Sequence, residues 1–460
     1  MGCETTLATE SRLACETTLG DREPVGVVVF GAMPALRTMT GSILGTVALL
    51  ALSATGGAQP RPQNVALADR MLPADRMLPA ANGPVTIGAP PGNDEQAFAL
   101  ALLGRLGSTA PNLVLSPWGL DTVLGMLEPG AAGATQAGIA TALHSSGVPA
   151  TQQAGDLHTL DKNLARRAAA DHVVLDSANE AWLQKGLPVR SSYTDLLAAD
   201  FGSGAQEQDF AGDPSGAANA VNRWVADHTA GHITHLVTAN ELESSVFLLV
   251  NGVYMLAPWF EPFDPSGTFP GSFEVSADKT VTVPMMSDVE QAEEASASRT
   301  LDAVDLSFQG GDLSALVLMP PLGQLASFES QLTSARLTAI ISGLRSVAFS
   351  LEMPRFSVNS SLNVDHVLSA MGMAQAFSSS ANFANISPRF LKLNFVVQQA
   401  QIKVNEAGTE AAAGSGAGGG VGAVQYSLSI GINHPFLFLV LDNATQDVLF
   451  EAQVTDPALS

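Results

Sequence analysis

The stretch that decides the fold is residues 395–424, FVVQQAQIKVNEAGTEAAAGSGAGGGVGAV. Apolar and polar side chains alternate at its start, which predicts a strand over residues 395–405. Gln398 is the one polar side chain on the apolar face of this strand. We therefore expect the strand to pack that face against a core. The face otherwise holds Val396, Ala400, Ile402 and Val404.

A run with almost no side-chain bulk follows the strand from Glu406 onward. Read with a period of two, one side of this run carries only small, uncharged residues. Glu410, its one further charge, falls on the opposite side. A segment that must later become a buried strand needs this pattern, whereas a flexible linker between two strands, the alternative interpretation, does not. The small side comprises Thr409, Ala411, Ala413, Ser415, Ala417, Gly419 and Val421.

Motifs elsewhere in the chain favour the strand interpretation. Asn112-Leu-Val-Leu-Ser-Pro-Trp predicts a buried strand that runs into a helix beginning at Pro117. The other motifs are Val221-Asn-Arg-Trp-Val-Ala-Asp-His-Thr-Ala-Gly-His-Ile, Phe247-Leu-Leu-Val-Asn-Gly-Val-Tyr-Met-Leu-Ala-Pro-Trp, His434-Pro-Phe-Leu-Phe-Leu-Val and Val448-Leu-Phe-Glu-Ala-Gln-Val. Together with residues 395–424, these motifs resemble the serpin family in content and order over about residues 93–460.

This resemblance implies an α+β serpin fold with three β-sheets, about eight or nine helices and an exposed reactive-centre loop. Residues 93–460 would form one serpin domain, because no long linker recurs before the Gly-rich run. Residues 59–92 are Pro-rich and contain the duplication ADRMLP, so we expect a disordered tether.

The N-terminal residues 1–58 read as a doubtful extension followed by a secretory signal peptide over about 33–58. Arg37 precedes a mostly apolar run at 43–52, and small residues continue to Ala58, the expected cleavage position. The run is shorter than the roughly 20 residues of a membrane span. A secreted protein is therefore expected, and an uncleaved N-terminal membrane anchor is the alternative.

Composition excludes several classes of partner. The formal charge is −23 with no basic stripe, which argues against nucleic acid, heparin-like chains and anionic membranes. Cys3 and Cys15 both lie in the leader region, so after removal of the leader the folded part would have no disulfide or thiol chemistry. We expect a monomer without a cofactor.

As a serpin, the chain would be an inhibitor of serine, or of cysteine, endopeptidases and not an enzyme. The protease would cut an exposed bond and form its acyl intermediate. The freed segment would insert as a new strand into the large sheet and deform the covalent acyl-enzyme. Hydrogen bonds formed by about fifteen inserted residues would contribute on the order of 10 kcal/mol to the free energy that drives insertion. The six loop glycines would reduce this free energy by roughly 3–6 kcal/mol. We therefore expect a substantial substrate-like fraction.

The family's register from Glu406 places the reactive bond at Gly422–Ala423, with Val421, Val424 and Tyr426 as alternates. No Lys or Arg occurs between residues 404 and 433, and no Asp or Glu follows Glu410 there. A trypsin-like or acid-directed protease is thus disfavoured. Enzymes of elastase or subtilisin type are expected, or a chymotrypsin-like enzyme if Tyr426 is used.

The resemblance also implies a hinge and a shutter that control insertion. Two positions depart from the family pattern: Gln398 replaces a usual His and Gly119 a usual Ser. We expect Gln398 to hydrogen-bond to Asn251. The hinge comprises Glu406, Gly408, Thr409, Glu410, Ala411, Ala412 and Ala413. The shutter and the adjacent breach comprise Ser116, Asn251, Trp259 and Gln398.

Three other functions have some support in the sequence or in the family. His228, His232 and His235 have a spacing that suits a metal site, but Gly231 would interrupt the helix, so no metal is expected. A secreted hydrolase is disfavoured because the chain has no Gly-x-Ser-x-Gly elbow. The principal alternative is a non-inhibitory serpin that acts as a carrier or structural protein.

Overall fold

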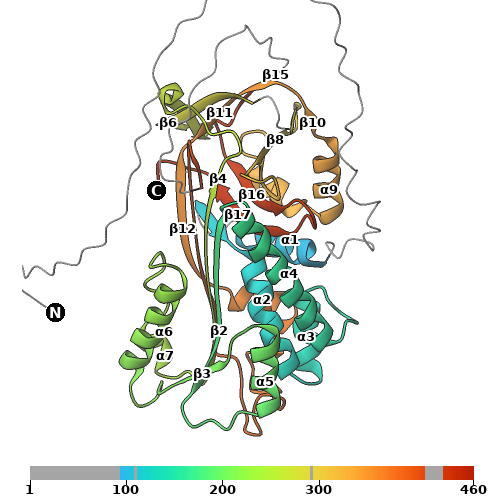
Figure 1. Ribbon diagram of the computed structural model, residues 1–460, viewed down its shortest axis with the longest axis vertical. Coiled ribbons are helices and arrows are strands. Elements are labelled where there is room, and N and C mark those ends of the chain that lie inside the picture. Colours follow the sequence, from blue (N-terminus) through green and yellow to red (C-terminus); the bar gives the residue numbers. More distant parts are fainter. Residues whose placement is uncertain (1–93, 108–110, 291–293, 410–427, 460) are drawn as a thin grey trace, which may run out of the picture. The chain divides into compact units, whose positions relative to one another are not determined.

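The computed structural model describes residues 94–107, 111–290, 294–409 and 428–459, and in these ranges the chain forms ten α-helices and three β-sheets (Figure 1). The predicted α+β class with three sheets is confirmed. The helices slightly exceed the eight or nine expected, because short segments such as the four-residue α7 (Ala239–Leu242) also form helices. Among these residues no helix has the length and apolar character that crossing a membrane requires.

The six-stranded sheet contains the stretch that decided the fold. Its strand order is β12-β13-β14-β4-β2-β3, and β13 also pairs directly with β4. β13 covers Phe395–Asn405, the range predicted from the alternating pattern. The other strands are β12 (Phe356–Asn363), β14 (Gly408–Thr409), β4 (Phe247–Pro258), β2 (Val174–Gln184) and β3 (Ala205–Gln208).

The other two sheets adjoin the upper part of this sheet (Figure 1). The seven-stranded sheet has the order β1-β17-β16-β9-β8-β7-β10, with β1 at Asn112–Leu115, β17 at Val448–Val454, β16 at Phe436–Asp442, β9 at Leu313–Met319, β8 at Asp302–Ser307, β7 at Glu294–Ala297 and β10 at Arg345–Ser346. The four-stranded sheet has the order β15-β11-β6-β5, with β15 at Leu428–Gly431, β11 at Phe349–Pro354, β6 at Lys279–Glu290 and β5 at Phe269–Ser276.

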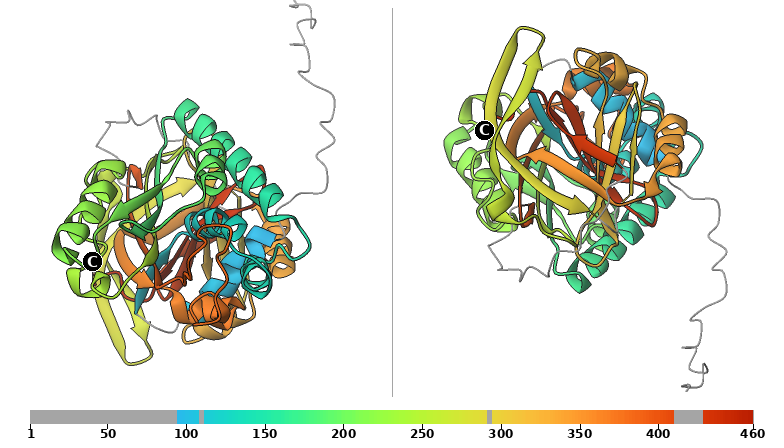
Figure 2. Two further views of the ribbon diagram at one scale, coloured as in Figure 1. Left: turned by 90° about the horizontal axis from the view of Figure 1, so that it is seen from below. Right: turned by 90° about the horizontal axis from the view of Figure 1, so that it is seen from above.

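Helices cover both faces of the lower part of the six-stranded sheet (Figures 1 and 2). Val221 and Val225 of α6 pack against Leu248 and Val250 of β4 on one face. On the other face, α2 packs against β2 and β4. The long helices are α1 (Asp94–Leu106), α2 (Pro117–Leu127), α3 (Ala134–Ala142), α4 (Ala150–Ala170), α5 (Ser191–Asp200), α6 (Pro214–His228) and α9 (Ser334–Gly343), and the short ones are α8 (Leu325–Ser330) and α10 (Asp365–Ala370).

Local sequence explains the start of α2, which positions part of the site. Ser116 has extended backbone angles and its Oγ accepts a hydrogen bond from Gly119 N at 3.1 Å, so it caps the helix. Pro117 occupies the first helical turn, where its missing N–H costs nothing. β1 and α2 therefore meet at a fixed corner beside β13.

Candidate functional site

A seam between β4 and β13 divides the six-stranded sheet. In its lower part the two strands pair directly and in parallel, from Phe395–Leu248 to Gln401–Tyr254. In its upper part β14 lies between them, pairing with Val404 on one side and with Ala257 on the other. The start of the Ala/Gly-rich run has thus already entered the sheet.

Gly408 and Thr409 fit the top of the seam closely. Thr409 is fully buried, and its Oγ1 accepts a hydrogen bond from Ala257 N at 2.7 Å. Gly408 has φ of +139°, and a Cβ built there would lie 2.1 Å from Ala257 O. Only glycine tolerates both the backbone angle and this contact.

Glu406 anchors the segment just before the seam. Its Oε1 accepts a hydrogen bond from Arg355 Nε at 2.6 Å and another from the hydroxyl of Thr268. Burial alone would raise the pKa of Glu406, but the Arg355 and Thr268 hydrogen bonds outweigh it and hold that pKa below its usual value. Trp259 N donates to Ala407 O at 3.0 Å, so the backbone here is held as well.

Trp259 holds the hinge from the side of β4. It is 3% exposed, and its indole Nε1 donates to Asn405 O at 3.0 Å. Its ring stacks on Phe308 with centroids 4.8 Å apart. A buried indole with a satisfied N–H is a rigid support, so the hinge rests on the core.

Gln398 lies in the middle of the lower seam and is fully buried. Its Nε2 donates to Asn251 Oδ1 at 2.5 Å and to Ser116 O at 2.7 Å. Its Oε1 accepts from Ser116 N at 3.0 Å. The structure therefore brings Ser116, Asn251 and Gln398 together, and one side-chain amide links both edges of the seam.

One participant in this network, Asn179, was not found by sequence reasoning. Asn251 Nδ2 donates to Asn179 Oδ1 of β2 at 2.5 Å. The sequence signal that could have identified Asn179 is its polar side chain within the strand segment Asp176-Ser-Ala-Asn-Glu. A Cβ at Gly119 would lie 2.6 Å from Asn251 Nδ2, so the Gly119 departure makes room for this amide.

The remaining predicted site residues lie outside the described residues. They are Glu410, Ala411, Ala412 and Ala413 of the hinge and Val421, Gly422, Ala423, Val424 and Tyr426 around the predicted reactive bond. Their roles stay predictions.

The three histidines occupy different local structures. α6 ends at His228, whose ring stacks on Trp224, and Gly231 then adopts φ of +81°. His232 stacks instead on Tyr254, with centroids 3.6 Å apart. In the part of the chain that the structure describes, no group of three or more His, Cys, Asp or Glu residues could hold a metal ion.

Known proteins are similar to this chain in sequence and in fold. The family model described as Serpin (serine protease inhibitor) matches residues 93–457. A "Serine protease inhibitor" of Cyanea capillata is 31% identical over 360 residues, covering 75% of this chain and 93% of that protein. "Iripin-2" of Ixodes ricinus is 30% identical and covers 78% of this chain and 91% of its own.

Solved structures agree with the architecture. Manduca sexta Serpin-12 has a TM-score of 0.71 at 24% identity, covering 80% of this chain and 99% of its own, which bears on the fold alone. Human thyroxine-binding globulin, solved in complex with its hormone, has a TM-score of 0.71 at 25% identity, covering 80% and 98%. The seam, the fold and the family model together show that the chain belongs to the serpin family.

Proposed function

We propose that this serpin is a secreted suicide-substrate inhibitor of serine endopeptidases. The single observation that carries the proposal is the position of Gly408 and Thr409, which extend the seam between β4 and β13 by the first two residues of a new strand. The next residues, 410–413, are Glu-Ala-Ala-Ala, so nothing bulky opposes further insertion. A protein whose loop never inserts has no need of such a fit.

The chemistry would belong to the protease. Its serine hydroxyl attacks the carbonyl carbon of the scissile residue, the peptide bond to the next residue breaks, and an acyl ester forms. The released segment then enters the seam, and the ester is carried away from its catalytic geometry before water attacks. The inhibitor contributes strand insertion and no catalytic side chain.

The reactive bond is proposed at Gly422–Ala423, with Val421, Val424 and Tyr426 as alternates. Lack of basic residues over 404–433 supports targets with small or apolar primary pockets. The net charge of −23 supports action without heparin, nucleic acid or an anionic membrane, and no cofactor is needed. The leader supports secretion, and a monomer is part of the proposal.

A carrier or structural role is the second candidate. Its support is the similarity to thyroxine-binding globulin, which was solved with a bound hormone. It is less favoured here, because the small hinge residues suit insertion.

The test is incubation with pancreatic elastase followed by denaturing electrophoresis. We expect a covalent band that resists denaturant, and a sharp rise in the melting temperature of any loop-cleaved fraction. Thr409→Arg should abolish the covalent band while cleavage continues, because an arginine cannot be buried at this position in the sheet. Thr234→Arg, at an exposed threonine, is the matched control and should leave the band unchanged. A carrier would give no covalent band and no rise in melting temperature.

A further inference from the structure

A cavity of about 610 Å³ lies away from the seam, beside the C-terminal end of α1. Its walls come from the β5–β6 turn at Ser276 and Ala277, from α8 at Leu325 and Ala326, and from Pro435. Ligand pockets of proteins typically measure about 300–1,000 Å³ and are mostly apolar with few polar groups. The size and lining of this cavity fall within that description.

Glu329 of α8 is the ionisable residue among the described residues that line the cavity. The side chain is 4% exposed, and in the described part of the chain its Oε1 has no hydrogen-bond partner. A buried carboxylate oxygen without a donor is costly, so the site is incomplete as it stands. A donor supplied by a ligand would relieve that cost.

Two oxygens converge at the end of the cavity. A Cβ built at Gly107 would lie 2.5 Å from Glu329 Oε2 and 2.8 Å from Gln453 Oε1. Behind them Glu451 of β17 is fully buried, and neither of its carboxylate oxygens has a partner among the described residues. The buried end of the cavity is therefore rich in hydrogen-bond acceptors.

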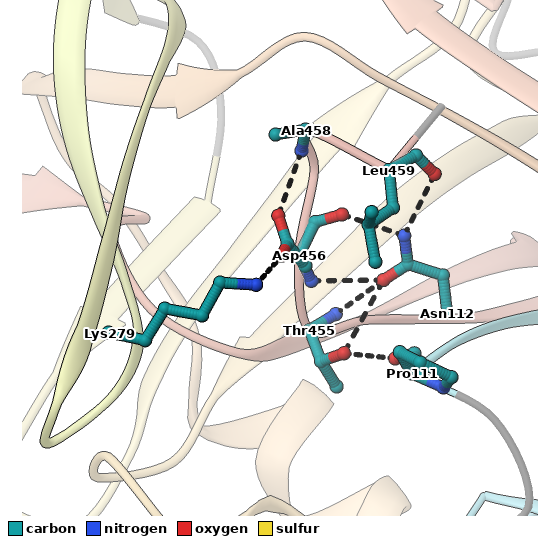
Figure 3. A network of polar contacts seen from close by, with 7 residues as sticks. All are labelled: Pro111, Asn112, Lys279, Thr455, Asp456, Ala458 and Leu459. Atoms are coloured by element: carbon teal, nitrogen blue, oxygen red, sulfur yellow. Dashed lines mark hydrogen bonds and ion pairs between the residues drawn. The ribbon is translucent and has the colours of Figure 1, made fainter.

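Lys279 is a cationic side chain near the cavity, and it already forms an ion pair. Lys279, next to the β5–β6 turn, pairs with Asp456 at 2.6 Å (Figure 3). Asn112 holds the same C-terminal turn by accepting from Asp456 N at 3.0 Å and from Thr455 N at 2.9 Å (Figure 3). Because Thr455 and Pro111 line the cavity and belong to this network, that wall is already formed.

We propose that this cavity binds a small organic cation, with an ammonium or guanidinium group at Glu329 and an apolar body against Leu325 and Pro435. Charged hydrogen bonds from such a group satisfy the carboxylate, and the apolar walls cover the rest of the ligand. The net charge of −23 favours approach of a cation. This site is independent of loop insertion, so it stands or falls separately from the proposed inhibition.

The ionisation of the buried carboxyls supports this assignment. Burial raises the pKa of Glu329 to about 7. Burial, and then repulsion from Glu329, raises the pKa of Glu451 well above its usual value. A bound cation favours the ionised carboxylate, so protons should be released on binding near neutral pH.

The test is calorimetric titration of the intact protein with 2-phenylethylammonium chloride, beside the uncharged 2-phenylethanol and the anionic 3-phenylpropionate. We expect a Kd below about 1 mM for the cation and at least about tenfold weaker binding of both comparators. The binding enthalpy should differ between phosphate and Tris buffers because protons are released.

Glu329→Gln keeps the shape of the side chain and should weaken cation binding by about tenfold or more. Glu243→Gln, at an exposed carboxylate, is the matched control and should bind as the parent does. Ala326→Trp narrows the cavity without touching the carboxylate and should also weaken binding. Unchanged melting temperatures would exclude misfolding. The proposal is overturned if the cation does not bind, if 2-phenylethanol binds equally well, or if Glu329→Gln binds like the parent.

Discussion

Replacing Gln398 with alanine tests how the seam is held shut. The side chain makes three hydrogen bonds, two to the backbone of Ser116 and one to Asn251 Oδ1. All three partners are buried, so alanine leaves Ser116 N, Ser116 O and Asn251 Oδ1 without the amide. Ser116 O still accepts a hydrogen bond from Leu120 N at 3.1 Å, so Ser116 N and Asn251 Oδ1 are the two groups left unsatisfied. Each unsatisfied buried group costs about 1–3 kcal/mol, which gives a loss of at least about 2 kcal/mol.

This loss has two measurable consequences. For a domain of this size, about 2 kcal/mol corresponds to a melting temperature lower by about 3 °C. The bond to Asn251 cannot persist once a strand separates β13 from β4, so its removal destabilises the native state relative to a strand-inserted state. Conversion to a latent or polymeric form at moderate temperature should therefore be about fivefold faster, which corresponds to roughly 1 kcal/mol.

The assay is differential scanning calorimetry together with native electrophoresis after timed heating. Gln399→Ala is the matched control, because Gln399 is the same residue type one position along and faces the other side of β13. Its amide makes a hydrogen bond to Asn359 Oδ1 at 3.2 Å in an exposed setting. It should change stability by about 0.5 kcal/mol or less. Equal melting temperatures and conversion rates for Gln398→Ala and the parent would refute the role of the seam amide.

Three further predictions concern the hinge and the loop. Arg355→Met should destabilise the protein at neutral pH. Arg355 lowers the pKa of Glu406 in the folded state, so the Arg355–Glu406 pair stabilises the fold at pH values above about 4.5, the pKa of Glu406 in the unfolded chain. This contribution to stability is lost as the pH falls below that value and Glu406 becomes protonated. Urea titrations of parent and variant should therefore differ at pH 7 and converge at low pH, and a constant difference would contradict this account. Gly408→Ala should expel the hinge, because its Cβ would overlap Ala257 O, and we expect faster hydrogen exchange at the Ala257 amide; unchanged protection would contradict the fit. Titration of active elastase should consume more than one inhibitor per enzyme, because glycines in the 414–422 segment slow insertion, and one-to-one consumption would show otherwise.

Much of the scaffold follows from local pattern. The alternation around Gln398 predicted a strand over residues 395–405, and β13 has these bounds. Pro117 begins α2, as its position after Ser116 indicated. These features depend on neighbouring residues, so the sequence carries them directly.

Contacts between distant segments were harder to predict. Glu406 was identified as a hinge residue, but its partner Arg355 lies 51 positions earlier, and no periodicity links the two. Asn179 was missed for the same reason, since its partner Asn251 is 72 positions away. The buried Glu329 and Glu451 could not be recognised, because glutamates usually lie at the surface and the burial of these two depends on how α1 packs against α8 and β17.

The arrangement of amides explains where the seam must part. Insertion separates neighbouring strands by one further strand spacing, about 4.8 Å, which no 2.5 Å hydrogen bond can span. On one side, Gln398 keeps both of its bonds to Ser116, which is tied in turn to Leu449 O of β17 at 2.7 Å. On the other side, Asn251 keeps its bond to Asn179, because β2 and β4 stay paired. Each edge therefore retains its own partner, and the bond between Gln398 and Asn251 is the side-chain link that opening must break. Glutamine suits this position because one amide donates to Ser116 O and to Asn251 Oδ1 at once, so it closes the seam without preventing its opening.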